Sequence, residues 1–179
     1  SPPPGAETEC LRATVSDTIN NDAYAYQTIG NQNVSYVRGY IYLDEEGFND
    51  GESLKTLELY DSSNDRVTGI FIAQLGGDLK LKFLYYSGDT TAATAGLSIA
   101  LDTWYLVEYK YDLAGMTWEI RIDGATKASG SLAAQTRTPN KMAVGILASN
   151  ATSTTTLYTE LAAWETDQWI GEEPTRSEE

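Results

Sequence analysis

Short runs of alternating apolar and polar residues, each closed by a cluster of turn-forming residues, recur along almost the whole 179-residue chain. Tyr, Val, Ile and Thr are frequent in the runs, and Gly, Asn, Asp and Ser fill the breaks. Alternation with a period of two residues is typical of strands that turn one face to a core, and helical periodicity is almost absent. The pattern predicts strands over 22–29, 34–43, 54–60, 67–75, 79–86, 97–101, 103–111, 118–123, 125–131, 141–148 and 156–165.

Many short strands in a chain of single-domain length predict an all-β fold built from antiparallel strands, either a sandwich or a barrel. No stretch approaches the roughly 18 consecutive apolar residues of a membrane-spanning helix. We divide the chain into a Pro-rich lead (1–11), one β domain (12–171) and an acidic tail (172–179).

One predicted hairpin has a register that two patterns support. In this register one face is wholly apolar, and the other face sets opposite charges across from each other. A slip by one residue would destroy both patterns at once. The predicted pairs are Tyr111–Trp118, Tyr109–Ile120, Val107–Ile122, Lys110–Glu119 and Glu108–Arg121.

This hairpin resembles the concanavalin A-like jelly rolls, and specifically the laminin-G-like group. The resemblance is carried by DTWYLVEYKYD at 102–112 and WEIRIDG at 118–124, with LYTELAAW at 157–164 and WIG at 169–171 as a similar last strand. The family often has an Asp pair in that strand, whereas this chain has Glu160. The resemblance implies a two-sheet antiparallel jelly roll but no particular activity, because lectins, lyases, glucanases and virion proteins share the architecture.

The charged and reactive residues exclude several classes of ligand and of catalytic mechanism. The net charge is −14, with 12 basic and 26 acidic residues, which excludes nucleic acid and argues against an anionic membrane surface. Because the chain has no histidine, Ser-His-Asp and Cys-His nucleophiles and histidine-bound zinc are also excluded. The single cysteine, Cys10, allows no disulfide within the chain.

The strand over 34–43 carries the candidate ligand-binding residues. Aromatic rings suit stacking on sugars, and a guanidinium suits paired hydrogen bonds to hydroxyls. The structural alternative is that the rings cover an ordinary sheet face while the arginine pairs with a neighbouring carboxylate. The row consists of Tyr36, Arg38, Tyr40 and Tyr42.

Two enzyme hypotheses rank below binding. A glycosidase needs two carboxylates roughly 5 to 9.5 Å apart, whereas Glu119 and Asp123 on one strand would be about 13 Å apart. A polysaccharide lyase would use a Tyr or His base beside Arg or Gln. The row from Arg38 to Tyr42 partly fits that description but lacks the histidine. We therefore expect a protein that is not an enzyme.

An acidic loop after that row is the candidate calcium site. Closely spaced oxygen ligands suit calcium, although the spacing is not that of an EF-hand, and a solvated loop is the alternative. The hypothesis requires no cofactor, and one structural calcium is an option at this loop. Residues 44–52 and 165–179 each contribute −5 to the net charge, so a cation or a basic neighbour would meet the chain there. The candidate ligands are Asp44, Glu46, Asn49, Asp50 and Glu52.

These observations favour a non-catalytic, extracellular jelly-roll module that binds a glycan or another surface ligand. The alternative is a structural protein of an assembly, such as a phage or virion decoration or fibre protein or an extracellular filament subunit, with copies of itself as partners. A polysaccharide lyase or glycosidase ranks third. The expected location is extracellular or on a virion surface, without membrane insertion.

Overall fold

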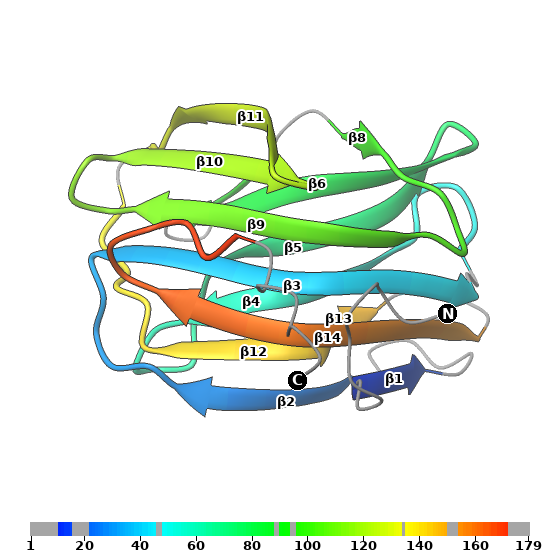
Figure 1. Cartoon of the computed structure of the whole chain (residues 1–179), viewed down its shortest axis with the longest axis horizontal. Helices are drawn as coiled ribbons and strands as arrows, with labels where there is room; N and C mark the ends of the chain where they lie inside the picture. Colours follow the sequence, from blue (N-terminus) through cyan, green and yellow to red (C-terminus); the bar gives the residue numbers. More distant parts are fainter. Residues whose placement is uncertain are drawn as a thin grey trace, which may run out of the picture.

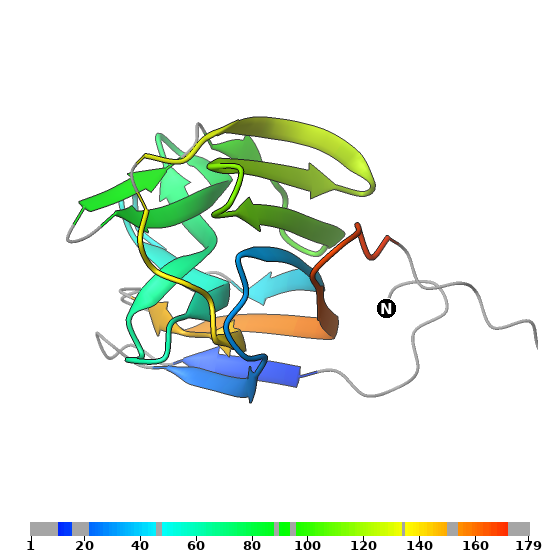
Figure 2. The same cartoon turned by 90° about the vertical axis from the view of Figure 1, so that its left-hand side faces the viewer.

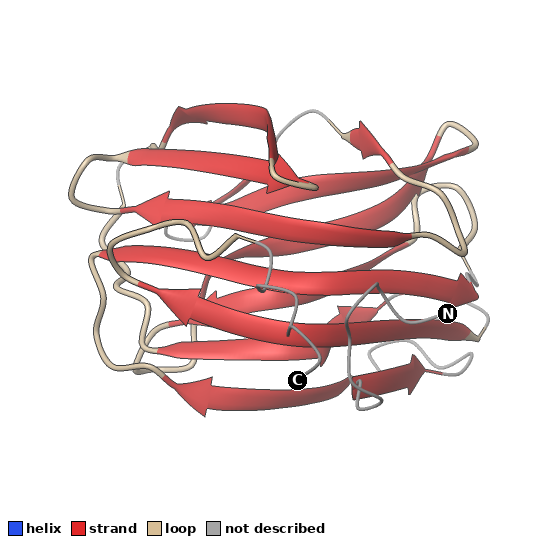
Figure 3. Cartoon of the chain, in the orientation of Figure 1, coloured by secondary structure: helices blue, strands red, loops and turns tan. Residues whose placement is uncertain are grey.

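The computed structural model describes residues 11–15, 22–45, 48–87, 90–93, 96–133, 135–149 and 154–171. These residues form two antiparallel sheets joined by turns and loops (Figure 3). The first sheet has the order β1-β14-β3-β9-β10-β11. Its strands are β1 (Leu11–Val15), β14 (Thr155–Glu165), β3 (Val34–Glu45), β9 (Trp104–Asp112), β10 (Thr117–Ile122) and β11 (Ala125–Ser131).

The second sheet has eight strands in the described part of the chain. Its main path runs β2-β12-β4-β5-β6-β7, with β13 beside β4 and β8 beside β6. The strands are β2 (Ala23–Thr28), β12 (Lys141–Ile146), β4 (Ser53–Tyr60), β5 (Arg66–Leu75), β6 (Asp78–Ser87), β7 (Thr90–Ala93), β13 (Ala148–Ser149) and β8 (Leu97–Ser98). Figures 1 and 2 show the two sheets stacked face to face.

The core lies between the sheets and contains side chains from both. Phe83 of the eight-stranded sheet is fully buried, stacks on Trp118 at 5.2 Å between ring centroids and lies 5.4 Å from Tyr109. Burying such rings supplies much of the hydrophobic free energy of a domain this size. The expectation of an all-β, two-sheet jelly-roll sandwich is therefore confirmed.

Most predicted strands lie within two or three residues of their observed limits. The sequence pattern missed β1 and β7, which are only five and four residues long, and it joined β12 and the two-residue β13 into one strand over 141–148. β1 is still part of the sheet, because Ala13 and Val15 are buried and the strand pairs with β14 from Leu11↔Thr159 to Val15↔Thr155. Runs this short give too few alternations to be recognised.

The predicted hairpin register is confirmed along β9 and β10, from Tyr111↔Trp118 to Val107↔Ile122. The predicted opposite charges do lie across from each other on the two strands. Ion pairs are also observed within each strand, between residues two positions apart. Lys110 Nζ lies 2.9 Å from Asp112 Oδ2, and Arg121 Nε lies 2.9 Å from Glu119 Oε1.

The division into a lead, a domain and a tail stays a prediction, because residues 1–10 and 172–179 lie outside the described part of the chain. Within the described residues, no helix is long and apolar enough to cross a membrane.

Candidate functional site

An irregularity in β4 determines which of its side chains reach the surface. The register with β5 shifts between Thr56 and Leu59 and again between Leu59 and Tyr60, and Leu57 has a positive φ of 46°. An extra residue of this kind is a β-bulge, which changes the direction of the side chains after it. Leu57 and Leu59 stay fully buried in the core, while Glu58 and Tyr60 belong to the outer face of the eight-stranded sheet.

Glu58 is a charged residue buried on that outer face, with 1% of its side chain exposed. Its Oε2 accepts a 2.7 Å hydrogen bond from the Tyr60 hydroxyl and a 3.0 Å hydrogen bond from Arg66 Nε. Arg66 Nη2 also donates to the Leu147 carbonyl at 3.1 Å. A buried carboxylate is tolerated only when its charge is compensated, and the Arg66 guanidinium provides that compensation.

The buried carboxylate changes the acidity of the groups around it. Burial and the nearby Glu58 charge raise the pKa of both Tyr60 and Tyr86 well above the ordinary value. Burial alone would lower the pKa of Arg66, but Glu58 and Tyr60 outweigh it and raise that pKa. Burial and the Arg66 charge lower the pKa of Lys55. Tyr60 is therefore a neutral phenol at neutral pH, beside an arginine that is always charged.

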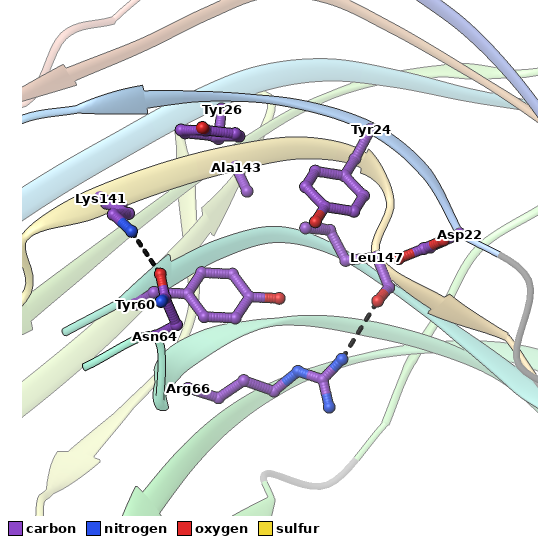
Figure 4. Close-up of a pocket in the computed structure, with 9 residues that line it drawn as sticks. All are labelled: Asp22, Tyr24, Tyr26, Tyr60, Asn64, Arg66, Lys141, Ala143 and Leu147. Carbon is purple, nitrogen blue, oxygen red and sulfur yellow. Dashed lines mark hydrogen bonds between the residues drawn. The ribbon is translucent and has the colours of Figure 1, made fainter. Parts of the chain in front are cut away.

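Tyr60 and Arg66 line a pocket of about 510 Å³ on this face. Figure 4 shows Tyr24 and Tyr26 of β2 on one side of the view and Tyr60 and Arg66 on the other. Tyr24 and Tyr26 are 48% and 66% exposed, so their rings are available to a ligand. The remaining lining residues are Asp22, Asn64, Lys141, Ala143 and Leu147.

Three of the lining residues form a row across three neighbouring strands. Lys141 of β12 is in register with Tyr60 of β4, and Tyr60 is in register with Arg66 of β5. Lys141 Nζ donates a hydrogen bond to Asn64 Oδ1 and lies 5.8 Å from the centre of the Tyr26 ring. The phenol therefore lies between two cations, an arrangement that suits an anionic ligand.

Further cations continue along the same face, away from the pocket. Lys55 and Lys82 are in register on either side of Phe71, and Lys80 is in register with Ala73. Tyr60 is five positions after Lys55 on β4, or about 15 Å of strand. Five of the chain's 12 basic residues thus lie on one face of a protein whose net charge is −14, and two of them are paired there, Arg66 with Glu58 and Lys80 with Asp78. We call this set the cationic face, and its members are Lys55, Arg66, Lys80, Lys82 and Lys141.

The row predicted from the sequence lies on β3, on the outer face of the other sheet. Tyr42 packs its ring 5.1 Å from Trp104 and 5.9 Å from Tyr158, and its hydroxyl donates to Asp102 Oδ1 at 3.1 Å. Arg38, in contrast, is buried at 3% exposure. The row therefore shares a face as expected, with Tyr36 and Tyr40 completing it, while its ability to bind a ligand stays a prediction.

The segment after β14, which is red in Figure 2, contacts two members of that row, Tyr36 and Arg38. Arg38 Nη1 donates to the Gly171 carbonyl at 2.7 Å, and the Gly171 amide donates to Glu108 Oε1 at 2.7 Å. The Trp169 ring lies 3.7 Å from the Arg121 guanidinium and 5.1 Å from the Tyr36 ring. These contacts bind a segment of the chain itself, and they favour the structural interpretation for Arg38.

The predicted calcium loop is only partly described, because Glu46 lies outside the described residues. Glu52 Oε2 accepts a hydrogen bond from the Asn49 amide at 2.8 Å, and Asp50 Oδ1 accepts one from the Gly76 amide at 2.5 Å. The described residues hold no cluster of three or more carboxylate, cysteine or histidine ligands. Calcium at Asp44 and its neighbours stays a prediction, to be tested by the effect of EDTA on the melting temperature.

The pocket is not predicted by the alternation of apolar and polar residues. Strict alternation over 54–60 would place Glu58 and Tyr60 on the same face as Leu54 and Thr56, which point into the core. The available signal was the two leucines that flank Glu58, Leu57 and Leu59, in a segment followed by a strand that begins with Arg66. Without knowledge of the bulge, that signal does not tell which face of the sheet Glu58 and Tyr60 occupy.

Solved structures with a similar fold match the chain at low sequence identity. No family model and no curated protein matches the chain. A sialidase matches with a TM-score of 0.64 and 12% identity over 91% of this chain, which spans 16% of the sialidase. The PL7 alginate lyase AlyA1 from Zobellia galactanivorans matches with a TM-score of 0.59 and 16% identity, covering 89% of this chain and 78% of the lyase.

The alginate lyase AlyC3, solved in complex with dimannuronate, has a TM-score of 0.64 and 7% identity, covering 88% of this chain and 74% of the lyase. The chain is therefore a jelly-roll β-sandwich protein, and identities this low establish the fold alone. The neighbours nevertheless correct two expectations. Because alginate lyases recur among them, the expectations of a non-catalytic module and of a protein that is not an enzyme are contradicted.

Proposed function

We propose that this protein is a polysaccharide lyase that cleaves an acidic polysaccharide by elimination at the pocket around Tyr60 and Arg66. The observation that carries the proposal is the row Lys141–Tyr60–Arg66, in which a neutral phenol lies in register between two cations. The recurrence of alginate lyases among the structural neighbours supports it. It also supports membership of the concanavalin A-like group.

Elimination on a uronate requires three things of a site. The carboxylate of the sugar must be neutralised, the proton on the carbon beside it must be removed, and the leaving oxygen must be protonated. Arg66, with 32% of its side chain exposed, and Lys141 are placed to neutralise the sugar carboxylate. Tyr60 lies between them and is placed to remove the proton from the sugar and to protonate the leaving oxygen.

Proton transfer can be balanced with the groups at the pocket. The Tyr60 oxygen takes the proton from C5 of the uronate as its own hydroxyl proton passes to Glu58 Oε2, 2.7 Å away. The electron pair of the C–H bond forms the C4–C5 double bond, and the glycosidic C4–O bond breaks. The proton on Glu58 then returns to Tyr60 as Tyr60 protonates the leaving oxygen. This cycle uses no histidine.

The cationic face indicates the charge of the substrate. A chain with net charge −14 repels a polyanion unless cations are concentrated where it binds. Lys55 and Lys82 flank Phe71 about 15 Å from Tyr60, a span of several sugar units. The exposed rings of Tyr24 and Tyr26 would stack on sugars at the other side of the pocket.

A hydrolase is less well supported by the same pocket. Asp22 is the one carboxylate among the described residues that line it, and Glu58 is buried at 1% exposure. Hydrolysis by paired carboxylates needs two of them facing the sugar. An extracellular location, where acidic polysaccharides occur, is part of this proposal.

The proposal is tested by incubating the protein with alginate and with other polyuronates and following the ultraviolet absorbance of the unsaturated product. Tyr60→Phe should abolish the absorbance change, since it removes the proton carrier and keeps the ring. Tyr158→Phe, on the opposite sheet, is the matched control and should retain full activity. Equal activity in the Tyr60→Phe and wild-type proteins would refute the assignment of Tyr60.

A further inference from the structure

A tyrosine of the opposite sheet contacts the bulge that precedes Glu58. Tyr109 of β9 is fully buried in the core, and its hydroxyl donates a 2.7 Å hydrogen bond to the carbonyl oxygen of Leu57. A bulge leaves backbone groups without their partners in the sheet ladder, and a buried carbonyl without a partner is costly. Tyr109 supplies that partner from across the core.

Backbone conformation and side-chain packing fix the bulge in addition to this hydrogen bond. Leu57 has a left-handed φ of 46°, which is strained for a residue with a side chain. Its side chain packs against Gly39 of β3, where a Cβ would lie 2.8 Å from Leu57 Cδ2. The six-stranded sheet therefore fixes both the backbone and the side chain of Leu57.

The next residue along the chain is confined from its other side. Gly69 of β5 lies against Glu58, and a Cβ there would lie 2.5 Å from Glu58 Cγ and 3.0 Å from its Cα. Glu58 is thus held between the Leu57 bulge and the Gly69 backbone. Since Tyr60 and Arg66 both bond to Glu58 Oε2, its placement sets theirs.

We propose that Tyr109 is a positioning residue for the candidate site, which acts through the Leu57 bulge to hold the Glu58 carboxylate against Tyr60 and Arg66. The inference rests on the proposed function for its effect on catalysis, but its structural part does not. Tyr109 itself lies in the core and touches no substrate.

The test is the variant Tyr109→Phe, which removes the hydroxyl and keeps the buried ring. Its crystal structure should show the Glu58 carboxylate displaced from the Tyr60 hydroxyl, beyond hydrogen-bond distance. The kcat on a polyuronate should fall by about tenfold to a hundredfold, with KM little changed, because the cations that bind the substrate remain. The matched control is Tyr105→Phe on the same strand, whose hydroxyl accepts a hydrogen bond from the Ala100 amide far from the bulge.

If the Tyr109→Phe protein does not fold, Gly39→Ala tests the same bulge by pressing on the Leu57 side chain, and the same displacement of Glu58 is expected. A wild-type position of Glu58 in Tyr109→Phe, or the same loss of kcat in Tyr105→Phe, would overturn the inference. If the wild-type protein has no lyase activity, the crystal structures still decide the positioning role, so the two failures are distinguishable.

Discussion

Tyr60 donates a 2.7 Å hydrogen bond to Oε2 of Glu58, the same oxygen that accepts the 3.0 Å hydrogen bond from Arg66 Nε. One buried carboxylate oxygen thus orients the phenol and the guanidinium together. This shared acceptor fixes the spacing of the two groups that the proposed reaction needs at the pocket.

Replacing Glu58 by Gln should lower both activity and stability. The amide cannot take the Tyr60 proton, so activity should be lost. The Arg66 guanidinium also loses its counter-charge, although partial exposure lets water compensate. The free energy of unfolding, measured in urea, should fall by about 1–3 kcal/mol. Asp78→Asn, which removes an exposed ion pair with Lys80, is the control and should change stability by less than about 1 kcal/mol.

Arg38→Ala tests the alternatives for the row on β3. The buried guanidinium binds the Gly171 carbonyl and is in register with Glu108, so its loss should cost about 2–3 kcal/mol of stability. Activity per folded molecule should be unchanged, because the pocket is on the other sheet. Loss of polysaccharide binding at unchanged stability would instead favour a ligand role for Tyr36, Arg38, Tyr40 and Tyr42.

Alkaline pH should destabilise the protein through its buried tyrosines. Burial raises the pKa of Tyr109 and Tyr111 above 10. For Tyr60 and Tyr86, burial and the nearby Glu58 charge together raise the pKa. The stabilisation is therefore fully present below about pH 10, where unfolded tyrosines stay protonated, and is lost as pH rises towards the folded-state pKa. Urea midpoints measured from pH 8 to 11 should fall steeply above pH 10. The fall should be shallower in Tyr111→Phe, and an identical slope would contradict this cause.

Binding of an acidic polysaccharide should depend on the cationic face and on salt. Lys82→Glu reverses a charge beside Phe71 without touching the pocket. It should raise KM at least severalfold at low ionic strength while leaving kcat near wild type, and the difference should shrink as sodium chloride screens the charges. Lys127→Glu, on β11 of the other sheet, is the matched control and should leave KM unchanged. Equal effects of the two variants would indicate a general charge effect.

The fold and one register were predictable because alternation persists wherever a strand has one buried face. The hairpin pairing Tyr109↔Ile120 followed from that rule and from opposed charges. The pocket was not predictable, because the extra residue at Leu57 reverses the faces of Glu58 and Tyr60 relative to strict alternation. The bulge itself depends on Tyr109 and Gly39 of the opposite sheet, contacts that local sequence does not reveal.

For the row on β3, the sequence predicted the face of the sheet but not whether that face is covered. Alternation correctly placed Arg38 on the outer face of its sheet, but the covering segment at Trp169 and Gly171 comes from more than 130 residues further along the chain. A pattern of residue types on a strand does not tell whether the face is open to a ligand or covered by the chain itself.

The most direct test of the proposed function is the mass of the products formed from a defined polyuronate. Elimination gives an unsaturated end and products lighter by one water than those of hydrolysis. We expect such products with the wild-type protein and none with Tyr60→Phe. Saturated oligosaccharides, or an intact polymer with well-folded wild-type protein on every polyuronate tried, would contradict it.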